Sequence, residues 1–480
     1  MAVRLLHLAD LHLGSRHDYL GEGAEARSRE VKETFRRAVN LALEPSRGIG
    51  AVVISGNLFD QHTPDSETLS FVRGLLGRLV AARKPVILLP GYRDSLSYAD
   101  CVYKTERWPG VDVMTSASFE EPVVHNIDGV RVEFYGVAAE LSRTPREFLG
   151  FPEWDLQKDT PTEVLLEVES GAEQAPAPAS QATPVLRIGV LCCGLPDHEE
   201  AAVRPHFQTV EPTVLGQSGL DYIALGGYHG FTCLRLGSTT AVWPGTPIGR
   251  RFETGDLGQK SFVIAEIEPG HVHLRREPTE AAVLEDATVD LLAERITSPD
   301  DLTAAILARS GDQVIARLRV RGPLEFLCDF PEVASKVEAR FRHLELVDET
   351  DLLDSGLLRR IEGEHTIRGF FVRRMLARIE ALTQRAAASP GTSQIERDLA
   401  ISKRALKVGL EQFMEEEAAS DVLTPRQETQ RTETHVKPPS VRRDGQTPNN
   451  GHDVLELPEA RSRGLLRSER SSLKEGEASQ

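Results

Sequence analysis

The sequence predicts an α/β protein in which strands and helices alternate, followed by a smaller second domain. Three apolar runs, within residues 3–14, 51–55 and 85–90, each end in polar residues and predict buried strands. Between them, residues 27–44 and 66–83 repeat apolar side chains at helical spacing and predict amphipathic helices. This order is typical of an α/β domain whose site lies at the carboxyl ends of the strands.

The same pattern resumes further along the chain. Residues 110–137 predict short strands, and apolar runs that end in glycine-flanked polar residues return at 185–194 and 220–230. The stretch 171–184, GAEQAPAPASQATP, is too rich in Ala and Pro to fold, and we expect a flexible surface insertion there. We therefore expect a first domain over residues 1–270, closed by a final strand pair.

The C-terminal part has a different composition. Short strands mixed with helices predict a small α+β domain with a terminal helix over residues 271–384. A further helix is predicted over 394–418, because its apolar residues fall along one helical stripe. These residues are Ile395, Leu399, Leu406, Leu410 and Phe413. Residues 421–480 carry few aliphatic and no aromatic side chains, so they should be disordered.

Charge and cysteine content exclude several classes of protein. The 480 residues carry 56 Lys and Arg against 73 Asp and Glu, and this net charge of −17 argues against a protein that coats polyanions. No apolar run is long enough for a transmembrane helix or a signal peptide, so we expect a cytoplasmic protein without membrane contact. The five cysteines show no CxxC pattern, which excludes a zinc ribbon and suits reduced thiols.

Asp10 and His12 directly follow the first predicted strand. On a strand's period of two, both side chains point the same way, so both could reach one metal ion. Taken alone, the pair is equally consistent with a buried strand that ends in a surface Asp and a hydrogen-bonded His. The other strand ends decide between these interpretations.

Five predicted strand ends bring polar loops to one edge: ADLHLG, SGNLFD, PGYRD, VLCCG and ALGGYHG. Their order and spacing resemble the calcineurin-like metallophosphoesterases and, within this family, the SbcD-like DNA repair exonucleases. The segment AVWPGTPIGRRFE supports the resemblance, because it looks like the family's YPGSPxRxxF segment. The resemblance covers residues 1–270 and continues more loosely through a capping domain to residue 384.

The resemblance implies both a fold and a chemistry. The implied fold is a sandwich of two central sheets flanked by helices, with a small α+β capping domain and a helical, then disordered, C-terminal tail. The implied chemistry is phosphodiester hydrolysis by two divalent metals about 4 Å apart, which polarise the phosphate and activate water. Carboxylate, amide and imidazole ligands suit manganese-like ions, and one aspartate of the family bridges both metals.

Carried over residue by residue, the ligand set of the first metal largely survives. Asp10, His12 and His229 match ligands of the family. Asn57 stands where the family has the bridging aspartate. The resemblance therefore implies that these four residues mark the first metal site, with one negative charge missing.

The ligand set of the second metal does not survive. Tyr92, Cys193 and Gly227 stand where the family has an asparagine and two histidines. Two unshielded dications about 4 Å apart repel by roughly 16 kcal/mol at an effective dielectric of 20, and a neutral Asn57 cannot offset this as a bridging carboxylate does. We therefore expect a degenerate site that binds at most one divalent metal, and binds it weakly. Manganese is the metal that the ligands suit best, and a site without any metal is the other expectation.

Arg93 stands where the family has the histidine that assists the leaving group, so it is the candidate catalytic residue. Its guanidinium can grip phosphate oxygens bidentately. Alternatively it pairs inward with Asp94 or Asp60, and the sequence leaves both readings open. The two aspartates persist from the family's motifs, and we expect their carboxylates to orient neighbouring ligands.

Two functions remain open. The first is an SbcD-like subunit, a pseudoenzyme with little or no hydrolysis, that binds DNA ends or a partner in DNA repair. The alternative is an active phosphodiesterase or nuclease with one metal, in which Arg93 supplies the charge of the missing ion. The resemblance also implies a homodimer and an SMC-like coiled-coil ATPase, similar to SbcC, as partner. The helix at 394–418 is the candidate docking segment, unless it folds back on the capping domain.

Overall fold

A computed structural model describes most of the chain, and residues Met1–Asp421 form one compact unit within it. The description covers residues 2–116, 118–119, 121–138, 185–196, 198–202, 207–326, 328–352, 355–388 and 393–423. The insertion predicted at 171–184 lies outside the described residues, and so does the tail predicted at 421–480 from residue 424 onward. Among the described helices, none combines the length and apolar composition needed to cross a membrane.

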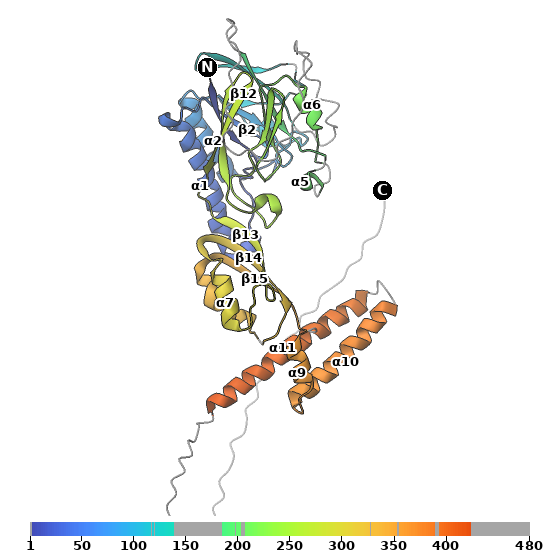
Figure 1. Cartoon of the computed structure of the whole chain (residues 1–480). Helices are drawn as coiled ribbons and strands as arrows, with labels where there is room; N and C mark the ends of the chain where they lie inside the picture. Colours follow the sequence, from blue (N-terminus) through green and yellow to red (C-terminus); the bar gives the residue numbers. More distant parts are fainter. Residues whose placement is uncertain are drawn as a thin grey trace, which may run out of the picture. The chain divides into compact units, whose positions relative to one another are not determined.

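The first sheet has six strands in the order β12-β11-β1-β2-β3-β4 (Figure 1). Its strands are β1 (Val3–Leu8), β2 (Ala51–Ser55), β3 (Val86–Leu89), β4 (Asp112–Val113), β11 (Ser261–Glu268) and β12 (His271–Pro278). Strands β1 to β4 run parallel, and β11 is antiparallel to β1. The first three predicted strands therefore end at the same edge, as expected.

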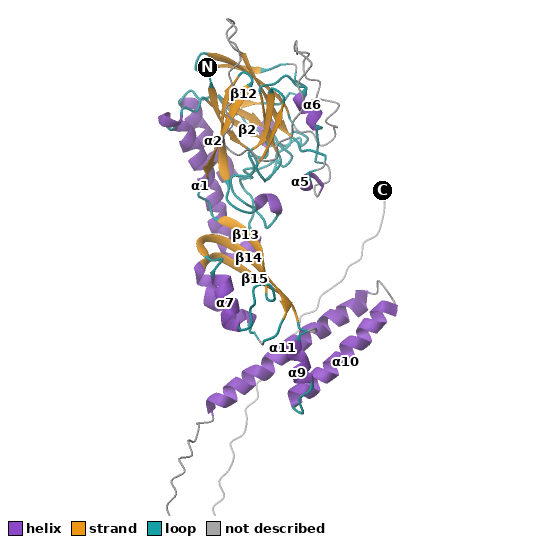
Figure 2. Ribbon diagram, in the orientation of Figure 1, coloured by secondary structure: helices purple, strands orange, loops and turns teal. Residues whose placement is uncertain are grey.

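The second sheet also has six strands, in the order β5-β6-β7-β8-β10-β9. Figure 2 draws the strands of this part of the chain in orange. Its strands are β5 (Val123–Ile127), β6 (Val130–Val137), β7 (Val185–Cys192), β8 (Tyr222–Gly226), β9 (Thr232–Leu236) and β10 (Thr239–Trp243). Strands β6, β7, β8 and β10 run parallel. The apolar runs predicted at 185–194 and 220–230 thus become neighbouring central strands of this sheet.

The two sheets pack face to face around one hydrophobic core, to which Val53, Val132 and Ile188 contribute. Helices α1 (Ala24–Leu43) and α2 (Ser66–Ala81) add apolar residues to the same core, and α6 (Pro212–Gly216) packs on the second sheet. Shorter helices are η1 (Asp18–Gly23), η2 (Pro45–Arg47), α3 (Val102–Thr105), α5 (Glu199–Ala202) and η3 (Thr254–Asp256). The predicted α/β fold, with two central sheets flanked by helices, is confirmed.

A third, three-stranded sheet follows, in the order β13-β14-β15. Its parallel strands and the helices packed on them are β13 (Val283–Asp290), α7 (Pro299–Leu307), β14 (Gly311–Pro323), α8 (Phe330–Val337), η4 (Glu338–Arg340) and β15 (Phe341–Asp351). Strand β12, which the sequence assigned to this second domain, instead pairs along its whole length with β11 of the first sheet. The first sheet therefore extends to Pro278. The domain boundaries that the sequence predicts at residues 270 and 384 stay predictions.

The helices α9 (Gly356–Glu362), α10 (Ile367–Ala388) and α11 (Ser393–Leu423) complete the described chain. The predicted apolar stripe of α11 is not free: Leu406 and Leu410 are buried, and Leu399 packs against the same core. The Phe413 ring contacts the Phe371 ring of α10, with ring centroids 5.5 Å apart. This stripe therefore covers the protein's own core, which is the fold-back alternative that the sequence left open for this helix.

Candidate metal centre

The loops that follow β1 and β2 adopt an unusual backbone conformation. Asp10, His12 and Asn57 have φ angles of +52°, +46° and +52°, in the left-handed region that residues other than glycine rarely occupy. Backbone hydrogen bonds between the loops hold this conformation, from Asp10 N to the Gly56 carbonyl (3.1 Å) and from His12 N to the Asn57 carbonyl (2.9 Å). Strained backbone of this kind concentrates at functional sites.

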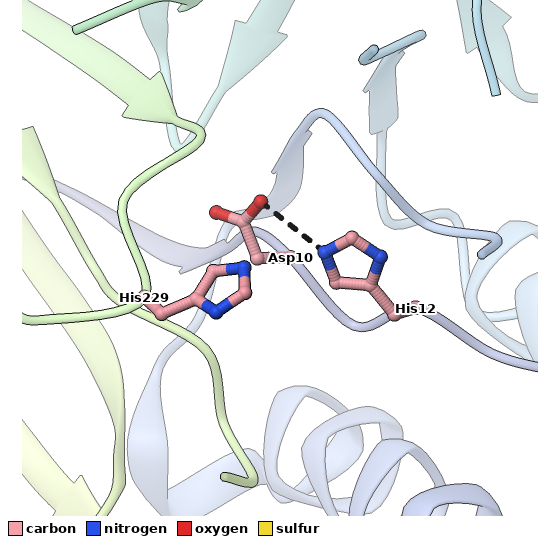
Figure 3. Close-up of side chains that lie close together, drawn as sticks. All are labelled: Asp10, His12 and His229. Atoms are coloured by element: carbon pink, nitrogen blue, oxygen red, sulfur yellow. Dashed lines mark ion pairs between the residues drawn. The ribbon is translucent and has the colours of Figure 1, made fainter. Parts of the chain in front are cut away.

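Asp10, His12 and His229 form a buried cluster at the carboxyl ends of β1 and β8 (Figure 3). One ligand atom of each lies within 4.8 Å of the others, and Figure 3 shows the His12 ring facing the Asp10 carboxylate. His12 Nε2 lies 3.7 Å from Asp10 Oδ1. Two histidines and one carboxylate thus converge from strands of different sheets.

His12 presents an unprotonated nitrogen to this cluster. Its Nδ1 lies 3.1 Å from Asp60 Oδ1, and an ionised carboxylate can only accept, so Nδ1 carries the proton. Burial, followed by the nearby Arg250 charge, holds the pKa of His12 below its usual value, so the ring is neutral. Nε2 is buried and has no hydrogen-bond partner. A buried, unsatisfied lone pair of this kind fits a metal ligand.

His229 is oriented in a similar way by groups that the sequence did not indicate. Its Nδ1 lies 3.1 Å from Asp256 Oδ2, and its backbone N–H donates to Glu200 Oε2 over 2.8 Å. Burial would raise the pKa of Asp256, but the neighbouring His229 and the hydrogen bonds that the carboxylate accepts lower that pKa to about 2. Asp256 is therefore ionised and accepts from Nδ1, which leaves Nε2 of His229 available to a metal.

Asp10 accepts two hydrogen bonds from groups at the site. Asn57 Nδ2 donates to Oδ1 over 2.7 Å, and the Gly227 N–H donates to Oδ2 over 2.8 Å. Burial would raise the pKa of Asp10, but the neighbouring His12 and His229 and the hydrogen bond from Asn57 hold it below its usual value. The other end of the Asn57 amide, Oδ1, accepts from the Arg93 N–H over 3.0 Å. Asn57 thus lies beside the cluster with both ends of its amide engaged by protein groups.

Aromatic side chains occupy the surroundings of two second-metal positions. The ring of Tyr92 packs 5.0 Å from the ring of Phe207, and its hydroxyl accepts from the Gln208 N–H over 2.6 Å. A Cβ atom added to Gly227 would lie 2.5 Å from the Phe207 ring, so a histidine there would clash with it. Burial raises the pKa of the Tyr92 hydroxyl above its usual value, so it stays protonated. No motif of the sequence analysis pointed to Phe207.

Cys193, the third second-metal position, points away from the site. Its side chain is buried in the apolar cluster around Tyr135 and Trp243, and burial raises the pKa of its thiol to about 12. The preceding Cys192 belongs to the core between the sheets, and its Sγ lies 2.7 Å from the place that a Gly56 Cβ would take. Adjacent strand residues face opposite sides, so the family's histidine position has no counterpart that reaches the metal cluster.

Asp60 and Asp94 have different roles. Asp60 orients His12 and also accepts from Arg250 Nη2 over 2.7 Å. Asp94 accepts from the backbone N–H groups of Phe59 (3.1 Å) and Gly91 (2.7 Å) and from the Tyr103 hydroxyl (2.7 Å). Asp94 therefore braces the two loops, and within the described chain none of its hydrogen bonds reaches the metal cluster.

Arg93 lies at the rim of the site. Its Nε donates to the Asp60 carbonyl over 3.1 Å and lies 3.6 Å from Asp60 Oδ1, and 53% of the side chain is exposed. Within the described chain its Nη groups make no hydrogen bond. Arg93 therefore pairs with Asp60 and not with Asp94, while the end of its guanidinium remains open to solvent.

The donor set fits a single divalent metal. One carboxylate and two neutral imidazole nitrogens are suitable ligands for manganese, iron or zinc, and each histidine is held by a carboxylate on its other nitrogen. The unsatisfied Nε2 of His12 supports this assignment. A second ion would need ligands that Tyr92 and Gly227 do not offer.

Comparisons with known proteins agree with this architecture. No family model matches the chain. It is 27% identical over 135 residues to the DNA double-strand break repair protein Mre11 of Saccharolobus solfataricus, a match that covers 28% of this chain and 33% of that protein. It is 31% identical over 101 residues to Mre11 of Sulfolobus acidocaldarius, with 21% of this chain and 25% of that protein covered. Each match thus spans a third or less of the relative's length.

A solved structure of a Vps29 single mutant from Entamoeba histolytica is 14% identical, covers 57% of this chain and 99% of its own, and gives a TM-score of 0.23. The sequence matches confirm the predicted resemblance to the calcineurin-like metallophosphoesterases, and the two-sheet fold and the Asp-His-His cluster agree with it. Within this class, the chain is similar to the Mre11 proteins of DNA double-strand break repair.

Proposed function

We propose that this chain is a DNA repair protein with a degenerate metallophosphoesterase site that holds at most one divalent metal. It has little or no hydrolytic activity and acts by binding DNA ends or a partner protein. The observation that carries the proposal is the packing of Tyr92 and Phe207 around the second-metal positions. The similarity to Mre11 proteins supports a role in DNA repair.

Asp10, His12 and His229 would hold the one metal. When bound, that metal would polarise a phosphate and lower the pKa of a water molecule. The protein's own residues prepare the site: Asp60 and Asp256 keep the two histidines in the tautomer that offers Nε2. Burial excludes bulk water from this cluster, which strengthens any electrostatic interaction with a phosphate.

The second candidate function is a phosphodiesterase or nuclease that works with one metal. The open guanidinium end of Arg93 favours it, because a fixed positive charge beside a single ion can stabilise a phosphate bidentately. Under this alternative, Arg93 would carry part of the charge that a second ion supplies elsewhere in the family.

A manganese-dependent assay on linear DNA and on a simple phosphodiester, bis(p-nitrophenyl) phosphate, separates the two functions. The proposal predicts no hydrolysis above that of the Asp10→Ala variant, together with binding of the linear DNA. The alternative predicts hydrolysis that falls about a hundredfold in Arg93→Ala. Arg251→Ala is the matched control, because Arg251 is an exposed arginine of the same region that pairs with Glu253.

The proposed partner is an SMC-like ATPase, and the helical hairpin of α10 and α11 remains the proposed docking site, through a different face. Ile367 and Phe370 of α10 are 79% and 58% exposed. They border a hollow of about 740 Å³ that Phe413 of α11 also lines. Exposed apolar side chains around a hollow are typical of a protein interface. A homodimer, which the resemblance implies, stays a prediction.

A further inference from the structure

A second pocket, of about 510 Å³, lies directly beside the candidate metal centre. His229 and Thr246 line one end of it. The Thr246 hydroxyl donates to the Asp10 carbonyl over 2.9 Å, so the pocket and the metal cluster share a wall. The remaining residues come from the loops after β8 and β10, from the segment that leads into β11 and from the edge strand β12. The volume is that of a small-molecule site and far exceeds that of a single inorganic ion.

Two cations face this pocket. Lys260 Nζ donates to the Gly255 carbonyl, and Arg276 donates from Nε to Ser261 Oγ over 3.0 Å. Neither side chain forms an ion pair within the described ranges of the chain, although both line the pocket. Burial lowers the pKa of each, which means that each charge is partly stripped of water without a counterion in contact.

The nearest acids are already engaged elsewhere. Asp256 and Glu200 lie close enough to raise the pKa of Lys260. Asp256 accepts from His229 Nδ1 and from the Arg250 N–H, and Glu200 accepts from the backbone N–H groups of His229 and Gly230. These hydrogen bonds direct both carboxylates toward the loop segments of His229 and Arg250. Lys260 and Arg276 therefore have room for an external anion as their counterion.

Another part of the pocket lining forms an apolar wall that includes an aromatic ring. Phe231, Leu257 and Leu274 line it, and the Arg276 guanidinium lies 4.5 Å from the Phe231 ring centroid. A guanidinium at this distance from an aromatic ring is held by cation–π attraction and can still bind phosphate oxygens through its outer nitrogens. The pocket therefore combines a site for a phosphate with a surface for a flat or apolar group.

We propose that this pocket binds a phosphorylated ligand of mononucleotide size, with the phosphate on Lys260 and Arg276 and the nucleoside against the apolar wall. The two sources with this chemistry are a free nucleotide and the 5′-phosphorylated end of a DNA strand. Binding needs neither a metal nor hydrolysis, so the proposal stands apart from the activity of the metal centre.

Isothermal titration of the full chain in EDTA tests the proposal with thymidine 5′-monophosphate, thymidine and inorganic phosphate as probes. We expect the monophosphate to bind at least about tenfold more tightly than either of the other two. Lys260→Ala and Arg276→Ala should each weaken it about tenfold, since each removes one charge-assisted contact. Arg275→Ala is the matched control, because Arg275 pairs with Glu277 and does not line the pocket. It should bind as the wild type does.

Melting temperatures of all variants establish that they fold, and Lys260→Gln and Arg276→Gln replace any alanine variant that does not. Unchanged affinity in both pocket variants would overturn the proposal, and so would equal affinity for thymidine or inorganic phosphate. The 5′-phosphorylated dinucleotide pTpT separates the two sources. Tighter binding than the monophosphate assigns the pocket to a strand end, and equal or weaker binding assigns it to a free nucleotide.

Discussion

Asn57 donates its side-chain amide to the Asp10 carboxylate over 2.7 Å, at the place where the metallophosphoesterase family has a bridging aspartate. A neutral donor here satisfies one oxygen of Asp10 without any ion. In an enzyme with two metals, this pair of side chains would be two carboxylates held apart by the cations. Under the proposed degenerate site, this hydrogen bond would replace part of the electrostatic role of the metals and let the loop structure persist without them.

Asn57→Asp should destabilise the protein in the absence of metal. It brings two buried carboxylates within about 3 Å, and one of them must take up a proton or the pair repels. In EDTA at neutral pH we expect a loss of about 2–4 kcal/mol, measured by urea unfolding. Added manganese, or a pH low enough to protonate the pair, should restore much of it. Asn57→Ala is the control: it loses the hydrogen bond, but neither manganese nor acid should rescue it.

His7 should make the protein less stable in mild acid. The His7 ring bridges the sheets through Tyr222 Oη and Ser55 Oγ, each 2.8 Å away, and burial lowers its pKa from 6.5 to about 3. The unfolded chain takes up a proton below about pH 6.5 that the folded chain refuses, so stability is present above this pH and falls as the pH drops toward 3. The slope for one group is about 1.4 kcal/mol per pH unit.

Urea unfolding of the wild type and of His7→Gln at several values between pH 7 and pH 4 measures this dependence. The variant should lose the His7 contribution and show a shallower slope. His125→Gln is a suitable control, because His125 is a partly exposed histidine that pairs with Asp112. If the free energy of unfolding changed with pH in the same way in the wild type and in His7→Gln, the lowered pKa of His7 would not be the cause of the acid sensitivity.

Cys193→His should not create a metal ligand, although the family has a histidine at this position. The side chain would enter the apolar cluster beside Trp243, where a larger polar ring overpacks the core and lacks a partner. We expect a loss of about 2–4 kcal/mol and unchanged manganese binding. Cys193→Ala, which only removes volume, should lose less. Manganese binding gained by the histidine variant would show that residue 193 can reach the metal.

Leu410→Ala should destabilise the helical part by about 2–5 kcal/mol, because Leu410 is fully buried in the core that α11 covers. Val408→Ala, two residues earlier on the same helix and 48% exposed, should change the free energy of unfolding by less than about 0.5 kcal/mol. Thermal unfolding followed by circular dichroism compares the two. If both variants changed the free energy of unfolding by the same small amount, the apolar stripe of α11 would not be part of the core.

Much of the fold follows from the sequence for a simple reason. Buried parallel strands that end in polar residues, as after Leu8, Ser55 and Leu89, give a strong local pattern, and parallel strands place these ends at one edge. The cluster of Asp10, His12 and His229 was predicted through the family resemblance, and the structure brings these three side chains together.

The groups that complete the site leave no such pattern. Asp256 lies 27 residues after His229, in a short turn of helix, and Phe207 has no sequence signature, so only the folded chain shows what they touch. Periodicity likewise shows that Leu406 and Leu410 share a face, but not which surface covers that face. Cys193 shows the same limit. Adjacent residues on a strand face opposite sides of the sheet, so a shift of one residue in the alignment decides whether a side chain faces the metal site or the apolar cluster around Trp243.

Metal content of the purified chain tests the central claim most directly. After dialysis against manganese, elemental analysis should find no more than one ion per chain, and His12→Ala should bind none, since it removes an imidazole nitrogen of the metal cluster that is buried without a hydrogen-bond partner. Two tightly bound ions per wild-type chain would contradict the account, because they would require ligands from the region that Tyr92 and Phe207 occupy.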